Sequence, residues 1–121
     1  MKRMKVVLSL AAVCLFAAAV SNVSTAAGPQ KGRGPSQVER GRAVYEARCT
    51  RCHGADGAGR TRMADIVEPP DMSDAAWQRK RGNAKMIASV SNGLGQMPAF
   101  KKKLSRQEIV AAVAYVRTLK R

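Results

Sequence analysis

Apolar residues recur at helical spacing in two segments at opposite ends of the region after residue 35. The first begins at Ser36, which forms the capping-box pattern of a helix start with Glu39, and it runs into Cys49. The second begins at Ser105 with the same spacing to Glu108, and its apolar positions continue toward the C-terminus: Ile109, Val110, Val113, Val116 and Leu119. The pattern predicts one helix in each segment.

Shorter helices are expected between these two. Ser73 or Asp74 can begin one that runs through Trp77, and Asn83 can cap another that stops at Gly93 and carries Met86, Ile87 and Val90. Glycines, prolines and polar residues dominate 54–72 and 93–100, so we expect loops there. Because no segment alternates like a strand, the prediction is an all-α fold with three to five helices.

The N-terminal segment is typical of a signal peptide. A basic start is followed by an apolar run over 6–20, and small residues precede a predicted cleavage after Ala26 or Ala27. An uncleaved anchor, or a lipoprotein signal lipidated at Cys14, is the alternative. We therefore assign 1–27 to a signal peptide, 28–35 to a flexible leader and 36–121 to one domain, and expect a periplasmic or otherwise exported protein.

Charge narrows the choice of partners. From residue 28 onward, 19 Lys and Arg face 8 Asp and Glu, a formal charge of +11. This surface favours anionic proteins, and membrane association is at most peripheral. Two tyrosines, two phenylalanines and one tryptophan offer little stacking surface, so no nucleic-acid partner is expected.

The chemistry centres on residues 49–53, which read Cys-Thr-Arg-Cys-His. Cys49 and Cys52 can form haem thioethers, a redox disulfide or half of a zinc site. Zinc needs four ligands, and the chain has no histidine or cysteine after His53. A redox disulfide needs a βαβ scaffold that this pattern does not offer. The spacing therefore favours one covalently bound haem c per chain, with His53 as the proximal iron ligand.

Two further residues are candidates around this haem. The Nδ1–H group of a ligating imidazole is commonly held by a backbone carbonyl, for which we nominate Pro70, with Pro69 as the fallback and loop stiffening as the alternative role.

Met97 is the candidate distal iron ligand. It follows His53 by 44 residues in a loop of glycines and proline, whereas Met86 falls on an apolar helical stripe. Met63 lies close to the cysteines in a polar loop, Met72 remains as a second candidate, and core packing is the alternative role of Met97.

On these motifs, Cys-Thr-Arg-Cys-His-Gly and the Gly93–Pro98 segment, the chain resembles a small class I cytochrome c from Ser36 onward. The resemblance implies the cytochrome c fold, with helices and loops wrapped around one haem whose edge is partly exposed. It also implies that the terminal helices cross through Gly41, Tyr45 and Tyr115, and that Pro70 supplies the carbonyl. Ala112 departs from the bulky aliphatic residue common in that family, so the packing is expected to depend more on Val113 and Val116.

The expected function is electron transfer rather than catalysis. With both axial positions taken, a monomeric protein would carry single electrons between periplasmic redox partners by Fe(II)/Fe(III) cycling. Lys101, Lys102 and Lys103 either form part of a docking surface for an acidic partner or are a solvated turn. The alternatives are a haem c module of a dehydrogenase or oxidase complex, and a haem peroxidase or gas-binding protein if Met97 is not a ligand.

Overall fold

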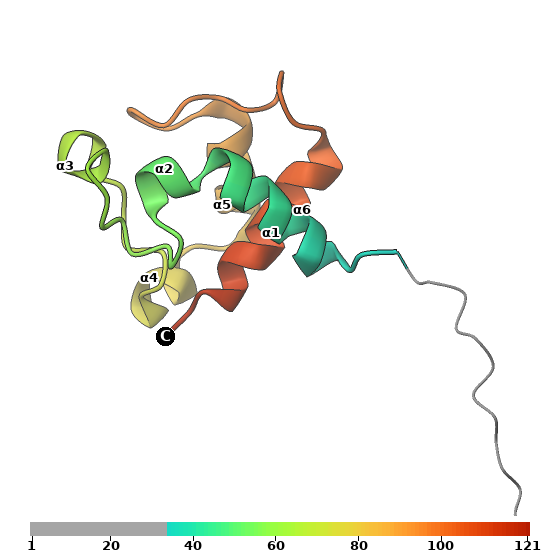
Figure 1. The fold of residues 1–121 in the computed structure, drawn as a ribbon, viewed down its shortest axis with the longest axis horizontal. Helices are drawn as coiled ribbons and strands as arrows, with labels where there is room; N and C mark the ends of the chain where they lie inside the picture. The colour runs from blue at the N-terminus through green and yellow to red at the C-terminus, as the bar shows by residue number, and fades with distance from the viewer. Residues whose placement is uncertain (1–33) are drawn as a thin grey trace, which may run out of the picture. The chain divides into compact units, whose positions relative to one another are not determined.

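The computed structural model describes residues 34–121. The predicted signal peptide and leader residues 28–33 lie outside the described residues. Within residues 34–121 there are six helices and no strand: α1 (Gln37–Arg48), α2 (Thr50–His53), α3 (Ala64–Val67), α4 (Ala75–Lys80), α5 (Asn83–Asn92) and α6 (Arg106–Thr118). Figure 1 shows longer loops after α2, α3 and α5, whereas α1 and α2, and α4 and α5, follow each other closely. The predicted all-α class is confirmed.

The structure has more helices than the three to five expected, because two of the six, α2 and α3, are single turns. The first, α2, is the turn that contains Cys52, and it is separated from α1 only by Cys49. The second, α3, interrupts the loop predicted over 54–72, where the Thr61 hydroxyl accepts a hydrogen bond from the Ala64 N–H. It ends at Glu68, whose φ of 45° is left-handed and is followed by Pro69.

Both predicted capping boxes are present. Ser36 Oγ accepts the Glu39 N–H at 3.2 Å, and the Glu39 carboxylate accepts the Ser36 N–H at 2.6 Å. Ser105 and Glu108 repeat both contacts at the start of α6. Each box satisfies two backbone donors that a helix start leaves free, so the sequence pattern alone fixed where α1 and α6 begin.

The crossing of α1 over α6 holds the fold together (Figure 1). Gly41 is buried there so tightly that a Cβ atom would lie 1.9 Å from the Ala111 carbonyl oxygen. Tyr45 and Tyr115 pack beside it, with ring centroids 5.3 Å apart. The backbone of Ala111 and Ala112 makes the close contact, and the small Ala112 side chain is itself buried.

The apolar core lies between this crossing and the middle helices. Its buried cluster contains Tyr45, Met72, Met86, Val113 and Val116. The predicted core position of Met86 is confirmed, and the two valines contribute to packing as expected.

One predicted cap is wrong. Asp74 does cap α4 by accepting the Trp77 N–H at 2.6 Å, but Gly82 rather than Asn83 precedes α5. The side chain of Asn83 instead accepts a hydrogen bond from Arg117 Nε at 2.7 Å. A distant partner on α6 therefore takes the oxygen that a local cap would have used. Gly93 ends α5 with a φ of 80°, as predicted.

No helix within residues 34–121 combines the length and the apolar character needed to cross a membrane.

Gly41→Ala is expected to lower the free energy of unfolding by about 3 kcal/mol, because α1 and α6 must move apart to admit a methyl group. Urea unfolding at neutral pH measures this loss. Gly34→Ala is the control, since nothing lies within 4 Å of its added methyl group. Equal midpoints for the two variants would show that the crossing tolerates a side chain.

Hydrogen bonds from Ser105 lower the pKa of the Glu108 carboxyl from its usual value. A carboxylate whose pKa is lower in the folded state stabilises the fold above its unfolded pKa, and this contribution is lost as the pH falls through the folded pKa. Glu108→Gln keeps the capping hydrogen bond without the charge. Stability of the variant, measured by urea unfolding from about pH 7 to about pH 3, should therefore fall less than that of the wild type. Parallel curves would contradict this.

Candidate cofactor site

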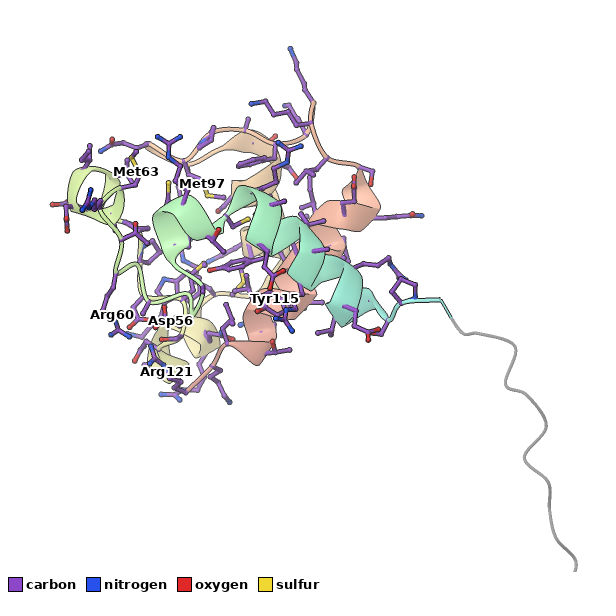
Figure 2. The ribbon with its side chains drawn as sticks, viewed as in Figure 1. Asp56, Arg60, Met63, Met97, Tyr115 and Arg121 are labelled. Carbon is purple, nitrogen blue, oxygen red and sulfur yellow. The ribbon has the colours of Figure 1, made fainter. Side chains whose placement is uncertain are left out.

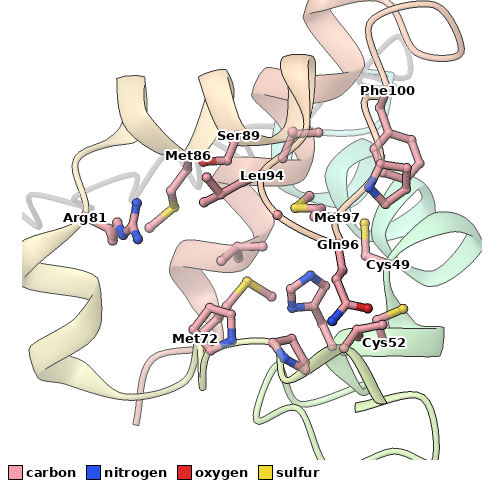
Figure 3. Close-up of a pocket in the computed structure, with 18 of the residues that line it drawn as sticks. Cys49, Cys52, Met72, Arg81, Met86, Ser89, Leu94, Gln96, Met97 and Phe100 are labelled. Atoms are coloured by element: carbon pink, nitrogen blue, oxygen red, sulfur yellow. The ribbon is translucent and has the colours of Figure 1, made fainter. Parts of the chain in front are cut away.

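A cavity of about 490 Å³ lies between α2, α4, α5 and α6 and the loops that follow α3 and α5 (Figure 3). We call it the cofactor cavity. Its volume falls in the range of small-molecule sites. All five predicted site residues line it: Cys49, Cys52, His53, Pro70 and Met97. Its other walls are mainly apolar and include Trp77, Met86, Val90, Val113 and Val116.

The two cysteines occupy adjacent turns of backbone at the junction of α1 and α2. Their thiols are unpaired. Burial, and secondarily the nearby Cys52, raises the pKa of the Cys49 thiol to about 11. A disulfide catalyst needs the opposite shift, because its nucleophile is the thiolate. The raised pKa of Cys49 therefore does not support the redox-disulfide alternative.

His53 ends α2 and lines the same cavity. Burial lowers the pKa of its imidazole, which favours the neutral form that binds metals. Its Nδ1 is buried and has no hydrogen-bond partner among the described residues. The structure contains no hydrogen bond from His53 to the Pro70 carbonyl among these residues, although Pro70 lines the same cavity. The carbonyl oxygen of Pro69, the fallback, lies close to Gly59, 3.2 Å from where a Cβ atom of that residue would be.

Backbone acceptors in and after α2 are held by side chains from elsewhere. The buried Tyr45 hydroxyl donates to the Gly54 carbonyl at 2.7 Å. The Thr61 hydroxyl lies 2.9 Å from the Arg51 carbonyl and 3.2 Å from that of Cys52. Sequence reasoning singled out Tyr45 only for the helix crossing and missed Thr61, since a threonine in a polar loop carries no distinguishing pattern.

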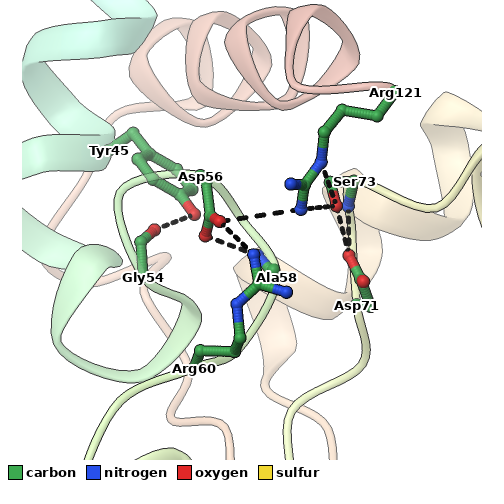
Figure 4. Close-up of polar contacts among 8 residues, drawn as sticks. All are labelled: Tyr45, Gly54, Asp56, Ala58, Arg60, Asp71, Ser73 and Arg121. Carbon is green, nitrogen blue, oxygen red and sulfur yellow. Dashed lines mark hydrogen bonds and ion pairs between the residues drawn. The ribbon is translucent and has the colours of Figure 1, made fainter.

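A polar network holds the loop that follows His53 (Figure 4). Asp56 accepts the Ala58 N–H at 3.0 Å and pairs with Arg60 at 2.8 Å. Arg121 reaches Asp56 at 3.6 Å and donates to the buried Ser73 hydroxyl at 2.7 Å. The network joins this loop to the segment before α4 and to Arg121. No sequence pattern predicted it.

Three methionines line the cofactor cavity, and they differ in what else they do. Met72 and Met86 belong to the buried core cluster, whereas Met97 does not and is partly exposed. Met63 precedes α3 and is not a lining residue (Figure 2). Met97 is therefore the one of these three methionines whose side chain is not part of the core cluster.

The loop that carries Met97 has a defined shape. Leu94 and Met97 exchange two backbone hydrogen bonds, at 3.1 and 3.0 Å. Gly93 has a positive φ, and a Cβ atom there would lie 2.7 Å from the Met97 carbonyl oxygen. Both the positive φ and the close approach require a glycine at position 93. The loop shaped in this way places Met97 at the cavity wall.

Two other sequence predictions, the zinc alternative and the lysine docking surface, can be compared with the structure. Residues 34–121 contain no group of three or more His, Cys, Asp or Glu side chains that could hold a metal ion, so nothing in that range supports the zinc alternative. Lys101, Lys102 and Lys103 are exposed in the turn before α6 and do not line the cofactor cavity.

The residues fit a covalently attached haem. Two unpaired thiols, an imidazole whose neutral form is favoured by burial, and a thioether outside the core cluster all line one mainly apolar cavity. Fold and site together define a monohaem c-type cytochrome domain, a class of electron-transfer protein.

Comparison with known proteins gives the family. Residues 36–116 match the family model described as Cytochrome C oxidase, cbb3-type, subunit III, and the chain belongs to that family. It is 32% identical over 91 residues to the Cbb3-type cytochrome c oxidase subunit CcoP of Azospirillum sp. (strain B510), covering 74% of this chain and 31% of that subunit. The chain thus spans about a third of the length of such relatives.

Smaller proteins are also similar. The chain is 27% identical over 81 residues to cytochrome c6 of Synechocystis sp. (strain PCC 6803), covering 67% of this chain and 64% of that protein. The solved structure of the KustC0563 c-type cytochrome superposes with a TM-score of 0.64 and 33% identity, over 67% of this chain and 98% of that one. The resemblance to a small c-type cytochrome is confirmed, and with it haem c as the cofactor.

Tyr45→Phe is expected to lower the free energy of unfolding by about 1–2 kcal/mol, because the Gly54 carbonyl loses a buried donor. The measurement is urea unfolding. Tyr115→Phe is the matched control: it removes a hydroxyl that makes no hydrogen bond to the described residues. If both variants lost the same stability, the Tyr45 hydroxyl would have no special role.

Proposed function

We propose that this chain carries single electrons between exported redox proteins, with haem c held by Cys49, Cys52, His53 and Met97. The observation that carries the proposal is that all four side chains line one cavity. Each thiol would add its S–H across one vinyl group of the porphyrin, which requires no leaving group. The bound haem supplies the Fe(II)/Fe(III) couple.

The protein residues determine how that couple behaves. His53 on one side and Met97 on the other would fill both axial positions, so that no substrate reaches the iron. Thioether ligation and the apolar walls both favour the reduced state, which predicts a comparatively high reduction potential. This supports a carrier rather than an enzyme.

Charge supports an acidic partner. Residues 75–107, which include α4, α5 and the Met97 loop, contain eight Lys and Arg and no Asp or Glu. Lys101, Lys102 and Lys103 are exposed within this segment. Such a concentration of one sign of charge raises encounter rates with an anionic surface and weakens in salt. We infer a monomer that meets its partners transiently in the periplasm, after cleavage of residues 1–27.

The second candidate is a haem c module docked on an oxidase. It is favoured by the similarity to CcoP subunits, although the chain spans only about a third of them. Size-exclusion chromatography of gently solubilised cells separates the two: a free carrier elutes as a small protein, and a module elutes with the complex.

Met97→Ala is expected to abolish the weak far-red absorbance that methionine sulfur gives ferric haem, because the thioether is lost. Met97→His should restore six-coordination and lower the reduction potential by on the order of 0.1 V, within the range that axial ligands cover. Optical spectroscopy and redox titration measure these effects.

Met86→Leu is the control, since this buried core side chain lines the same cavity. It should keep the far-red band. A band that survives in Met97→Ala contradicts the ligand assignment, and its loss in Met72→Leu would transfer the assignment to Met72. A purified wild-type chain without covalent haem would contradict the proposed function as a whole.

A further inference from the structure

One charged side chain on the cofactor cavity is partly buried and has no partner among residues 34–121. The charged residues that line the cavity are Arg48, Glu68 and Arg81. Arg81 is partly buried, and its guanidinium forms no hydrogen bond or ion pair with any residue of the 34–121 range. A partly desolvated cation against a mainly apolar wall is unfavourable unless an anion joins it. The cavity ligand is the natural source of that anion.

The backbone of Arg81 is held firmly at this wall. Its N–H donates to the Trp77 carbonyl at 3.0 Å, and its own carbonyl accepts a hydrogen bond from Arg117 Nη2. Arg117 also donates from Nη1 to the Gln78 carbonyl and from Nε to Asn83 Oδ1, both at 2.7 Å. One arginine of α6 thus fixes the corner between α4 and α5. Trp77 and Arg81, four residues apart, share the side of this segment that lines the cavity.

Arg81 lies at the end of the cavity away from the cysteines. Figure 3 shows it beside Met86, with Cys49 and Cys52 at the opposite end. Haem carries its two vinyl groups on one edge and its two propionate carboxylates on the opposite edge. If the cysteines hold the vinyl edge, the propionates extend toward Arg81. Arg48, which directly precedes Cys49, is at the vinyl end.

We propose that Arg81 binds a haem propionate through its guanidinium, and this rests on the proposed haem site. Arginine forms strong, charge-assisted hydrogen bonds with carboxylates, and the apolar surroundings strengthen them. Arg79 and Lys80, its neighbours in sequence, are exposed and do not line the cavity. Arg81 would therefore orient the haem and keep its propionate ionised.

The test is the reduction potential of the haem-loaded protein as a function of pH. In the wild type, the guanidinium holds the propionate pKa low. Arg81→Leu should move the propionate ionisation, seen as a step in the potential, to higher pH by about one unit or more. Above this step the potential should also be lower, because the lost positive charge had favoured the ferrous state. Arg81→Lys keeps a point charge and should move the step less.

Arg79→Leu is the matched control, since it removes the same charge from the exposed side of the same helix. Its step should coincide with that of the wild type. If Arg81→Leu carries covalent haem and its profile coincides with those of the wild type and Arg79→Leu, the propionate assignment is wrong while the haem site stands. Should Arg81→Leu fail to fold, Arg81→Lys decides: a step shifted relative to Arg79→Leu supports the assignment, and an unshifted one overturns it.

Discussion

The close contact of Gly41 with the backbone of Ala111 and Ala112 is the constraint on which the rest of the domain depends. It fixes α1 against α6. Each of these helices is next in sequence to a segment that lines the cofactor cavity. The cysteine turn follows α1 directly, and the Met97 loop leads into α6 through the lysine turn. Two segments more than forty residues apart therefore face one cavity, because their flanking helices meet at Gly41 with no side chain at that closest contact.

Specific polar contacts hold the loops around the cavity, in addition to the apolar packing of its walls. Tyr45 and Thr61 hold carbonyls in and after α2, and Arg121 joins the loop after His53 to Ser73. Arg117 donates hydrogen bonds to the Gln78 and Arg81 carbonyls and so holds the corner between α4 and α5. A domain of this size has a small core, so these side-chain hydrogen bonds add to what apolar packing contributes to its loops.

The charge distribution complements this arrangement. The half of the domain that carries Met97 holds most of the positive charge, whereas residues 34–74 carry slightly more acidic than basic residues. Such an uneven distribution of charge along the chain gives the domain an uneven electrostatic field. Similarity to both CcoP subunits and a cytochrome c6 indicates that this small domain is used as part of larger proteins and in compact ones.

Local patterns were enough to determine the class of cofactor, the starts of α1 and α6 and the choice of Met97 as a candidate, because capping boxes and the cysteine spacing act within a few residues. Tertiary contacts decided the rest. Asn83 does not cap α5 because Arg117 takes its oxygen, and His53 Nδ1 finds no acceptor at Pro70. Arg81 was one of several basic residues until the fold set it against the cofactor cavity. Such roles depend on residues outside the local sequence, which no local spacing records.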